Sequence, residues 1–266
     1  MKKIIMLTLA LGMILSSFVF TVSGEGEGVT VYVTIANGNL ALVKQQVAVN
    51  DVDGDGKITI NDSLVAAHRE YYPGIGDGYA YEITAYGISM TMLWGVENGG
   101  SYGYYVNDSM ALSLADELHE GDYVYAFAYT DTVNFSDTYS YFDISSVSAA
   151  VKEEFTLTLY SLGLDENWQP VVAPVEAATI VVDGNITQFK TDSQGRVTLS
   201  LDTEGEYVIS AVSESINLLP PVCLVKVEKE TPVTSDRNMN VVYISLAAVA
   251  IVIIAAALNR KVGYEK

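Results

Sequence analysis

Apolar and polar residues alternate along much of the chain, which is the pattern of β-strands with one buried face. Between Val29 and Ile35 every odd-numbered residue is Val or Ile, and every even-numbered residue is Thr or Tyr. A second strand is predicted at Gln46–Val49. Residues Ser63–Tyr72 instead place apolar side chains at helical spacing and stop at Pro73, which cannot continue a helix. The first part of the chain is therefore predicted to hold β-strands and one short helix.

The second part of the chain consists of short alternating runs separated by glycine turns. The runs lie between Phe155 and Val227, and the turns are Asp183-Gly184, Ser193-Gln194-Gly195 and Glu204-Gly205. Regular short strands of this kind predict a β-sandwich. We expect a mainly β fold in two domains, residues 25–148 and residues 149–229.

Two continuous apolar runs lie outside these domains. The first, Ile4–Phe20, follows Lys2 and Lys3 and is followed by small residues up to Gly24. This order predicts a secretory signal peptide, residues 1–24.

The second run, Val241–Leu258, predicts one transmembrane helix. It follows a polar linker at residues 230–240, and Arg260 and Lys261 come directly after it. A helix of this length, rising 1.5 Å per residue, just spans the hydrocarbon core. The basic pair predicts a cytoplasmic tail at residues 259–266. The expected localisation is the cell membrane, as a single-pass protein with its bulk extracellular and its C-terminus cytoplasmic.

Charge narrows the choice of partners. The whole chain has 14 basic and 33 acidic residues. The predicted signal peptide and tail contain five of the basic residues and one of the acidic residues. The rest of the chain therefore has nine basic and 32 acidic residues. A surface this acidic repels phosphates, so nucleic acid is not an expected partner, whereas a divalent cation is.

The strongest chemical motif is a twelve-residue loop, residues 51–62, of the kind that binds calcium. Calcium takes six to eight oxygen ligands, and such a loop offers them at positions 1, 3, 5, 7, 9 and 12. Gly56 stands where the chain must turn around the ion, and Ile58 is the apolar residue that anchors the loop. The predicted calcium ligands are Asp51, Asp53, Asp55, the carbonyl of Lys57, Thr59 and Asp62.

A solvated acidic turn is the alternative interpretation of the same residues. Four carboxylates within twelve residues repel one another unless a cation neutralises them, which favours calcium. Asp62 departs from the usual Glu, and its shorter side chain must approach the ion more closely. The loop has an exiting helix but no entering one, and in this it resembles a dockerin repeat. A dockerin carries two repeats, and only one copy is found here.

The first domain also resembles the β-grasp domain at the C-terminus of transcobalamin and intrinsic factor. The resemblance rests on the YxVN stretch Tyr104–Asn107 and the GDxV turn Gly121–Val124, and it covers Val29–Phe142. It implies a β-grasp fold with the calcium loop inserted between early strands. A wider pattern is similar to prokaryotic surface proteins; it consists of the calcium loop, Ala66-Ala67-His68, Leu93-Trp94-Gly95 and Tyr102-Gly103-Tyr104-Tyr105.

The second domain resembles immunoglobulin-like and carboxypeptidase-regulatory-like sandwiches. Residues Thr191–Leu199 and Gly205–Ala211 carry this resemblance. It implies a spacer or an adhesive module.

Several single residues have both a functional and a structural interpretation. Tyr123, Tyr125, Phe127 and Tyr129 alternate along one strand and face either a ligand or the core under the helix; core packing is favoured. His68 is expected to meet the sheet rather than bind metal. His119 is expected to be solvated, and the lone Cys223 to be a buried apolar residue. No catalytic motif is found, so an enzyme is not expected.

These observations predict a calcium-binding, membrane-anchored cell-surface protein for binding or adhesion, with a structural calcium ion and an unknown extracellular ligand or protein partner. One alternative is surface capture of a small ligand such as a corrinoid for uptake. The other is dockerin-like docking to a cohesin-type partner.

Overall fold

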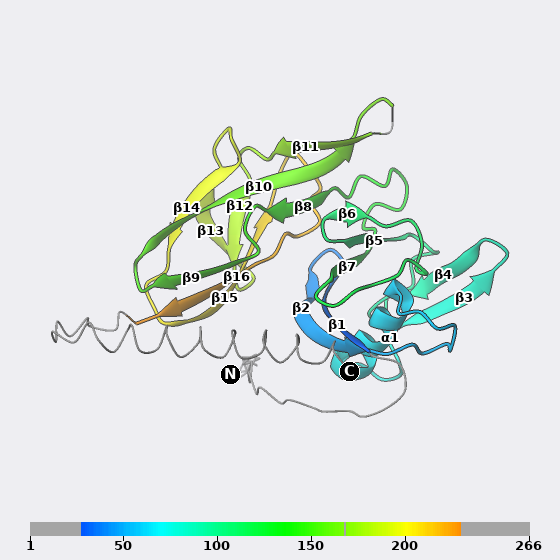
Figure 1. Cartoon of the computed structure of the whole chain (residues 1–266). Helices are drawn as coiled ribbons and strands as arrows, with labels where there is room; N and C mark the ends of the chain where they lie inside the picture. Colours follow the sequence, from blue (N-terminus) through cyan, green and yellow to red (C-terminus); the bar gives the residue numbers. More distant parts are fainter. Residues whose placement is uncertain (1–27, 168, 230–266) are drawn as a thin grey trace, which may run out of the picture. The chain divides into compact units, whose positions relative to one another are not determined.

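The computed structural model describes residues 28–167 and 169–229 (Figure 1). The predicted signal peptide, linker, transmembrane helix and tail lie outside these ranges. Within them, no helix has the length and apolar character needed to cross a membrane.

The first sheet has five strands in the order β2-β1-β7-β5-β6. Its two central strands, β1 and β7, run parallel, and every other neighbouring pair is antiparallel. The alternation that predicted the first strand is confirmed, while the second strand begins six residues earlier than predicted. The strands are β1 (Val29–Ala36), β2 (Leu40–Val49), β5 (Tyr102–Val106), β6 (Ser109–Met110) and β7 (Tyr123–Ala128).

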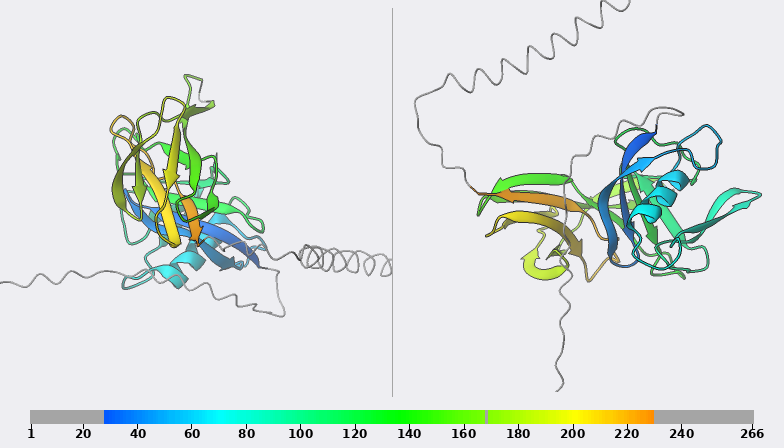
Figure 2. Two further views of the ribbon diagram at one scale, coloured as in Figure 1. Left: turned by 90° about the vertical axis from the view of Figure 1, so that its left-hand side faces the viewer. Right: turned by 90° about the horizontal axis from the view of Figure 1, so that it is seen from below.

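One face of this sheet is covered by the helix α1 (Ile60–Tyr71), which lies against β1 and β2 (Figure 2). The core between them is aliphatic, with Val31, Val33, Leu64 and Ala67 fully buried. Because strand residues alternate, the sheet residues Val124 and Ala126 of β7 also face this core.

The helix begins at Ile60, three residues before the predicted Ser63. Thr59 caps it: the Thr59 side chain accepts a hydrogen bond from the Asp62 backbone, and the Asp62 side chain accepts one from the Thr59 backbone. This reciprocal capping box satisfies two backbone N–H groups that a helix start otherwise leaves unpaired. The end of the predicted calcium loop, residues 59–62, is therefore the N-cap and the start of the first turn of the helix.

The tyrosine face of β7 packs against a different partner from the one expected. Tyr125 and Phe127 are each 1% exposed, so the prediction of core packing is confirmed, but they lie on the face of the sheet away from α1. Their cluster contains Tyr139 and Leu219, and the Tyr105 and Tyr139 rings stack at 3.9 Å. The helix occupies the opposite face because the period of two places aliphatic residues there.

A separate hairpin follows α1. It consists of β3 (Ala80–Thr84) and β4 (Gly87–Met92), which pair with each other as a two-stranded sheet (Figure 1). Ile83 and Tyr86 of this hairpin are almost fully exposed.

The remaining strands form a β-sandwich, as predicted. One sheet has β11, β10 and β14 with β8 also paired to β10, and the other has the order β13-β12-β15-β16-β9. Both sheets contribute to one core, in which Leu157, Ile180 and Ile209 are fully buried. The strands are β8 (Tyr139–Phe142), β9 (Ser146–Ala150), β10 (Glu154–Leu164), β11 (Pro170–Pro174), β12 (Thr179–Val182), β13 (Asn185–Lys190), β14 (Arg196–Ser200), β15 (Gly205–Val212) and β16 (Cys223–Glu228).

One of these strands, β8, precedes the division expected at residue 148, and another, β9, crosses it. β8 pairs with β10, and β9 is the edge strand beside β16. The sandwich sheets therefore take in residues from Tyr139 onward.

The close contact between β5 and β7 predicts that stability is sensitive to a larger side chain at Gly103. A Cβ added at Gly103 would lie 2.3 Å from the Phe127 ring, which is 1% exposed. Gly103→Ala should therefore destabilise the protein by about 1–3 kcal/mol through overpacking. Gly163→Ala is the matched control, because Gly163 also lies in a strand and a Cβ there meets nothing within 4 Å. Urea denaturation of both variants checks the difference; equal stabilities would contradict it.

Candidate metal centre

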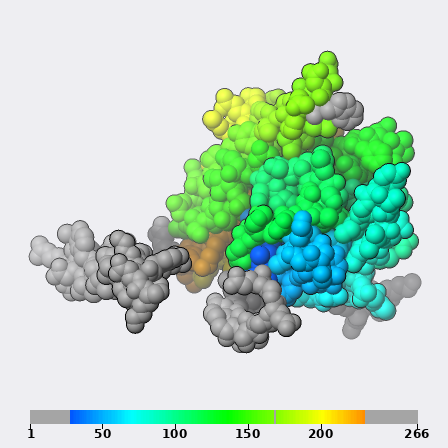
Figure 3. Space-filling model, turned by 45° about the vertical axis from the view of Figure 1, so that its right-hand side comes forward, coloured from blue at the N-terminus to red at the C-terminus, as the bar shows by residue number. Residues whose placement is uncertain are grey.

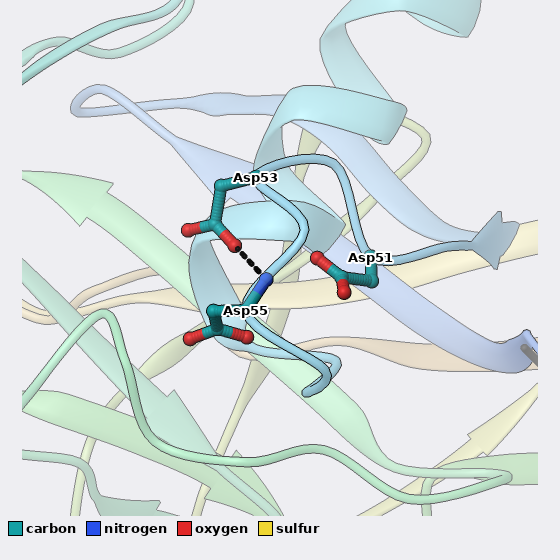
Figure 4. Close-up of side chains that lie close together, drawn as sticks. All are labelled: Asp51, Asp53 and Asp55. Atoms are coloured by element: carbon teal, nitrogen blue, oxygen red, sulfur yellow. Dashed lines mark hydrogen bonds between the residues drawn. The ribbon is translucent and has the colours of Figure 1, made fainter.

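The loop after β2 brings three of the predicted ligands together. Carboxylate oxygens of Asp51, Asp53 and Asp55 all lie within 4.8 Å of one another (Figure 4). Asp53 and Asp55 are exposed and Asp51 is partly buried, so the cluster opens to solvent. This group of oxygens could hold a metal ion.

The backbone of the loop is shaped by two glycines. Gly54 and Gly56 have φ of 78° and 85°, in the left-handed region that side chains rarely adopt. Their N–H groups donate to the Asp51 carboxylate, at 2.7 Å from Gly54 and 2.8 Å from Gly56. The bond from Gly56 is the largest cause that lowers the pKa of Asp51. Asp51 is therefore held as an anion inside the turn.

The neighbouring carboxylates act in the opposite direction on Asp53. Desolvation, followed by the charges of Asp55, Asp62 and Asp51, raises the pKa of Asp53. Its carboxylate also accepts a 3.2 Å bond from the Asp55 backbone (Figure 4). The charges of Asp55, Asp62 and Asp51 thus add to the effect of desolvation, and a cation bound among these carboxylates would offset their repulsion.

Asp62 and Thr59 connect the two ends of the loop. Asp62 is fully buried; its Oδ1 accepts from the Val52 backbone at 3.1 Å. Its Oδ2 accepts from the Thr59 backbone at 2.8 Å and from the Thr59 hydroxyl at 2.7 Å. Asp62 lies outside the cluster of three carboxylates. Lys57, whose carbonyl is the fourth predicted ligand, donates its backbone N–H to the Asp55 carboxylate at 2.8 Å.

The segment 114–118 holds the second half of the loop in place. Leu118 donates its N–H to the Ile58 carbonyl at 2.8 Å, and Asn61 donates to the Leu114 carbonyl at 2.9 Å. Leu114 and Leu118 are 1% and 3% exposed. Sequence reasoning missed this partner, although two leucines four residues apart in a polar segment were the available signal. Residues 114–118 of the same domain thus supply the backbone pairing that a second calcium loop would otherwise supply.

His68 is buried, but it packs against the aromatic rings of Tyr72, Tyr79 and Trp94, whereas the sequence predicted that it meets the sheet. Its Nδ1 lies 2.6 Å from the Leu64 carbonyl, and its Nε2 lies 3.0 Å from the Trp94 backbone N–H. The first atom must donate and the second accept, so the ring is neutral with its proton on Nδ1. Both nitrogens are therefore used by the backbone. Burial lowers the pKa of His68 from 6.5 to about 4.

Tyr72, one of the many tyrosines of the sequence, packs beside three glycines. An added Cβ would lie 2.4 Å from the Tyr72 side chain at Gly74, 2.5 Å at Gly78 and 2.3 Å at Gly95. The ring fills space that only glycine leaves open, and its edge meets the Trp94 ring at 5.3 Å. The glycines around Pro73 and the Leu93-Trp94-Gly95 motif thus serve one packing arrangement.

The other single residues lie where the sequence predicted. The His119 side chain is 79% exposed, 3.7 Å from Asp122. Cys223 is fully buried in β16. Burial raises the pKa of its thiol to about 12, so it is not reactive.

Comparisons with known proteins give no family. No protein-family model matches the chain, and no curated protein matches it. A structure of Clostridium thermocellum CbhA fibronectin(III)-like modules is similar at 12% identity and a TM-score of 0.28, over 56% of this chain and 88% of that one.

Two further solved structures are similar over smaller shares of their own length. Dscam1 isoform 4.44, N-terminal four Ig domains, has 9% identity and a TM-score of 0.23 over 75% of this chain and 44% of that one. A Bacteroides ovatus mixed-linkage glucan utilization locus protein, SGBP-B, has 17% identity and a TM-score of 0.20 over 57% of this chain and 35% of that one. The fold is defined by the strand order of the sheets and by their buried cores.

The buried neutral His68 predicts a loss of stability in acid. The unfolded chain takes up a proton on this histidine as pH falls through about 6.5, while the folded chain does so only near pH 4. Stability should therefore fall across this window, by on the order of 3 kcal/mol at about 1.4 kcal/mol per pKa unit.

Urea denaturation of the full chain between pH 4 and pH 7 measures this loss. His68→Gln, which cannot take up the proton, should have a shallower pH dependence. His119→Gln removes the exposed histidine and should keep the wild-type slope. Identical slopes for wild type and His68→Gln would contradict the assignment.

Proposed function

We propose that this protein is a calcium-binding, membrane-anchored cell-surface protein for binding or adhesion, in which the calcium ion is structural. The observation that carries the proposal is the loop that gathers Asp51, Asp53 and Asp55 within 4.8 Å. Hard oxygen donors suit calcium better than the softer metals, which prefer nitrogen and sulfur ligands.

The loop residues have separate parts in this proposal. Carboxylate oxygens would come from Asp51, Asp53 and Asp55. Further oxygen ligands would come from the Lys57 carbonyl and from Thr59. Asp62 would supply the last carboxylate, while its present bonds to Val52 and Thr59 fix the loop's two ends. Calcium would neutralise the charge concentrated there and stabilise the first turn of α1.

The first domain is proposed to be a β-grasp domain. Its support is the strand order, with a central parallel pair between two antiparallel hairpins, and a helix on one face after the first hairpin. The second domain is proposed to be an immunoglobulin-like spacer, supported by two sheets around a common core.

The extracellular position is supported by the two apolar runs of the sequence. Extracellular calcium is near millimolar, so a loop with a Kd of about 10⁻⁴ M is occupied there. A constant supply favours a structural ion over a switch. Docking through a dockerin pair is less supported, because the backbone of this single loop is paired with residues 114–118 of its own domain.

Calcium should raise the thermal midpoint of the purified full chain. At 1 mM calcium and a Kd of about 10⁻⁴ M, the expected gain is about 1.4 kcal/mol. Asp55→Asn should remove most of this gain, and in EDTA it should be at least as stable as the wild type because it relieves repulsion.

The matched control is Asp202→Asn, which makes the same charge change at an exposed turn outside the loop. It should keep the calcium response. The proposal fails if calcium leaves the wild-type midpoint unchanged, or if Asp55→Asn responds as fully as the control.

A further inference from the structure

A pocket of about 280 Å³ opens between the calcium loop, α1 and the strand β3. Figure 3 shows the loop and the β3–β4 hairpin, in blue and cyan, on the same face of the molecule. The volume of the pocket is slightly below the range typical of pockets for drug-sized ligands, so the pocket fits one small ring. The pocket is lined by apolar, aromatic and charged residues, which are Val52, Val65, His68, Arg69, Asp77, Tyr79, Ala80 and Tyr81.

One side of the pocket is aromatic. The rings of Tyr79 and Tyr81 lie 5.9 Å apart, and Tyr81 is 37% exposed. Tyr79 is 8% exposed, and its hydroxyl donates to Asn61 at 2.8 Å. Tyr79 is thus fixed in the wall, while Tyr81 has a free surface for an apolar ring face.

The lining also carries two exposed charges of opposite sign. Arg69 comes from the last turn of α1, and Asp77 from the segment before β3. Across residues 28–167 and 169–229, neither side chain has a hydrogen-bond or ion-pair partner, and the two do not pair with each other. Arg69 offers only donors and Asp77 only acceptors, so a ligand that both accepts and donates satisfies the two together.

This combination disfavours ligands that carry charge of a single sign. An anion is attracted by Arg69 but repelled by Asp77 and by the nearby loop carboxylates. A cation is attracted by Asp77 and the rings but repelled by Arg69. His68 offers nothing to a ligand because both of its nitrogens are bound to the backbone.

We propose that this pocket binds one neutral hydroxylated ring, a monosaccharide unit. Its C–H face packs on Tyr81, and its hydroxyls accept from Arg69 and donate to Asp77. The inference rests on the proposed function, since it names a ligand class for that surface protein.

The pocket is coupled to the calcium loop through Val52. Val52 lines the pocket, and its N–H donates to Asp62 at 3.1 Å. An ion that orders Asp62 also orders this wall. Saccharide binding is therefore stronger with calcium than in EDTA.

Saturation-transfer NMR tests the site on the full chain in a detergent without sugar groups. The probes are the methyl glycosides of glucose, galactose, mannose and N-acetylglucosamine at millimolar concentration. At least one gives saturable binding, and Tyr81→Leu and Arg69→Gln each weaken it about tenfold, or about 1.4 kcal/mol. The control Tyr86→Ala changes a tyrosine that is fully exposed in the same hairpin and leaves binding unchanged.

Three outcomes overturn the site. These are no saturable binding of any probe, binding unaffected by both pocket variants, and binding that is weakened by Arg69→Gln but not by Tyr81→Leu. The calcium midpoint is recorded on the same samples. A calcium shift without glycoside binding removes only this inference, whereas glycoside binding without a calcium shift removes only the calcium proposal.

Discussion

The buried carboxylate of Asp62 is the interaction on which the loop and the helix both depend. It accepts hydrogen bonds from Val52 at the start of the loop and from Thr59 at its end. One side chain thereby closes the loop and begins α1. Because α1 covers the aliphatic face of the first sheet, the position of the acidic cluster is set by the same core that holds the domain together.

The first sheet uses its two faces for different purposes. The face with Val124 and Ala126 packs on α1, and the face with Tyr125 and Phe127 packs on Tyr139 and Leu219. The Tyr125 hydroxyl donates to the Pro220 carbonyl at 2.9 Å. A strand with small aliphatic residues on one side and aromatic residues on the other can bury both sides without leaving a tyrosine hydroxyl unpaired.

Local patterns predicted most elements, and long-range pairing explains what they missed. The alternation in β1, the sandwich strands and the burial of His68 and Cys223 were readable because each depends on neighbouring residues. The early start of α1 needed the capping geometry of Thr59. The partner of Tyr125 and the anchoring of the loop by Leu118 depend on chain segments far apart in sequence, which no period records.

The pairing of Ile58 with Leu118 has a consequence for the order of assembly. Ile58 leaves the ribosome 60 residues before Leu118, whose N–H donates to the Ile58 carbonyl. Pairing over such a separation carries a loop-closure cost that local contacts do not. The acidic loop thus gains its backbone partners only after most of the domain has been made, so a truncated chain ending before residue 114 lacks the residues that hold this loop in place.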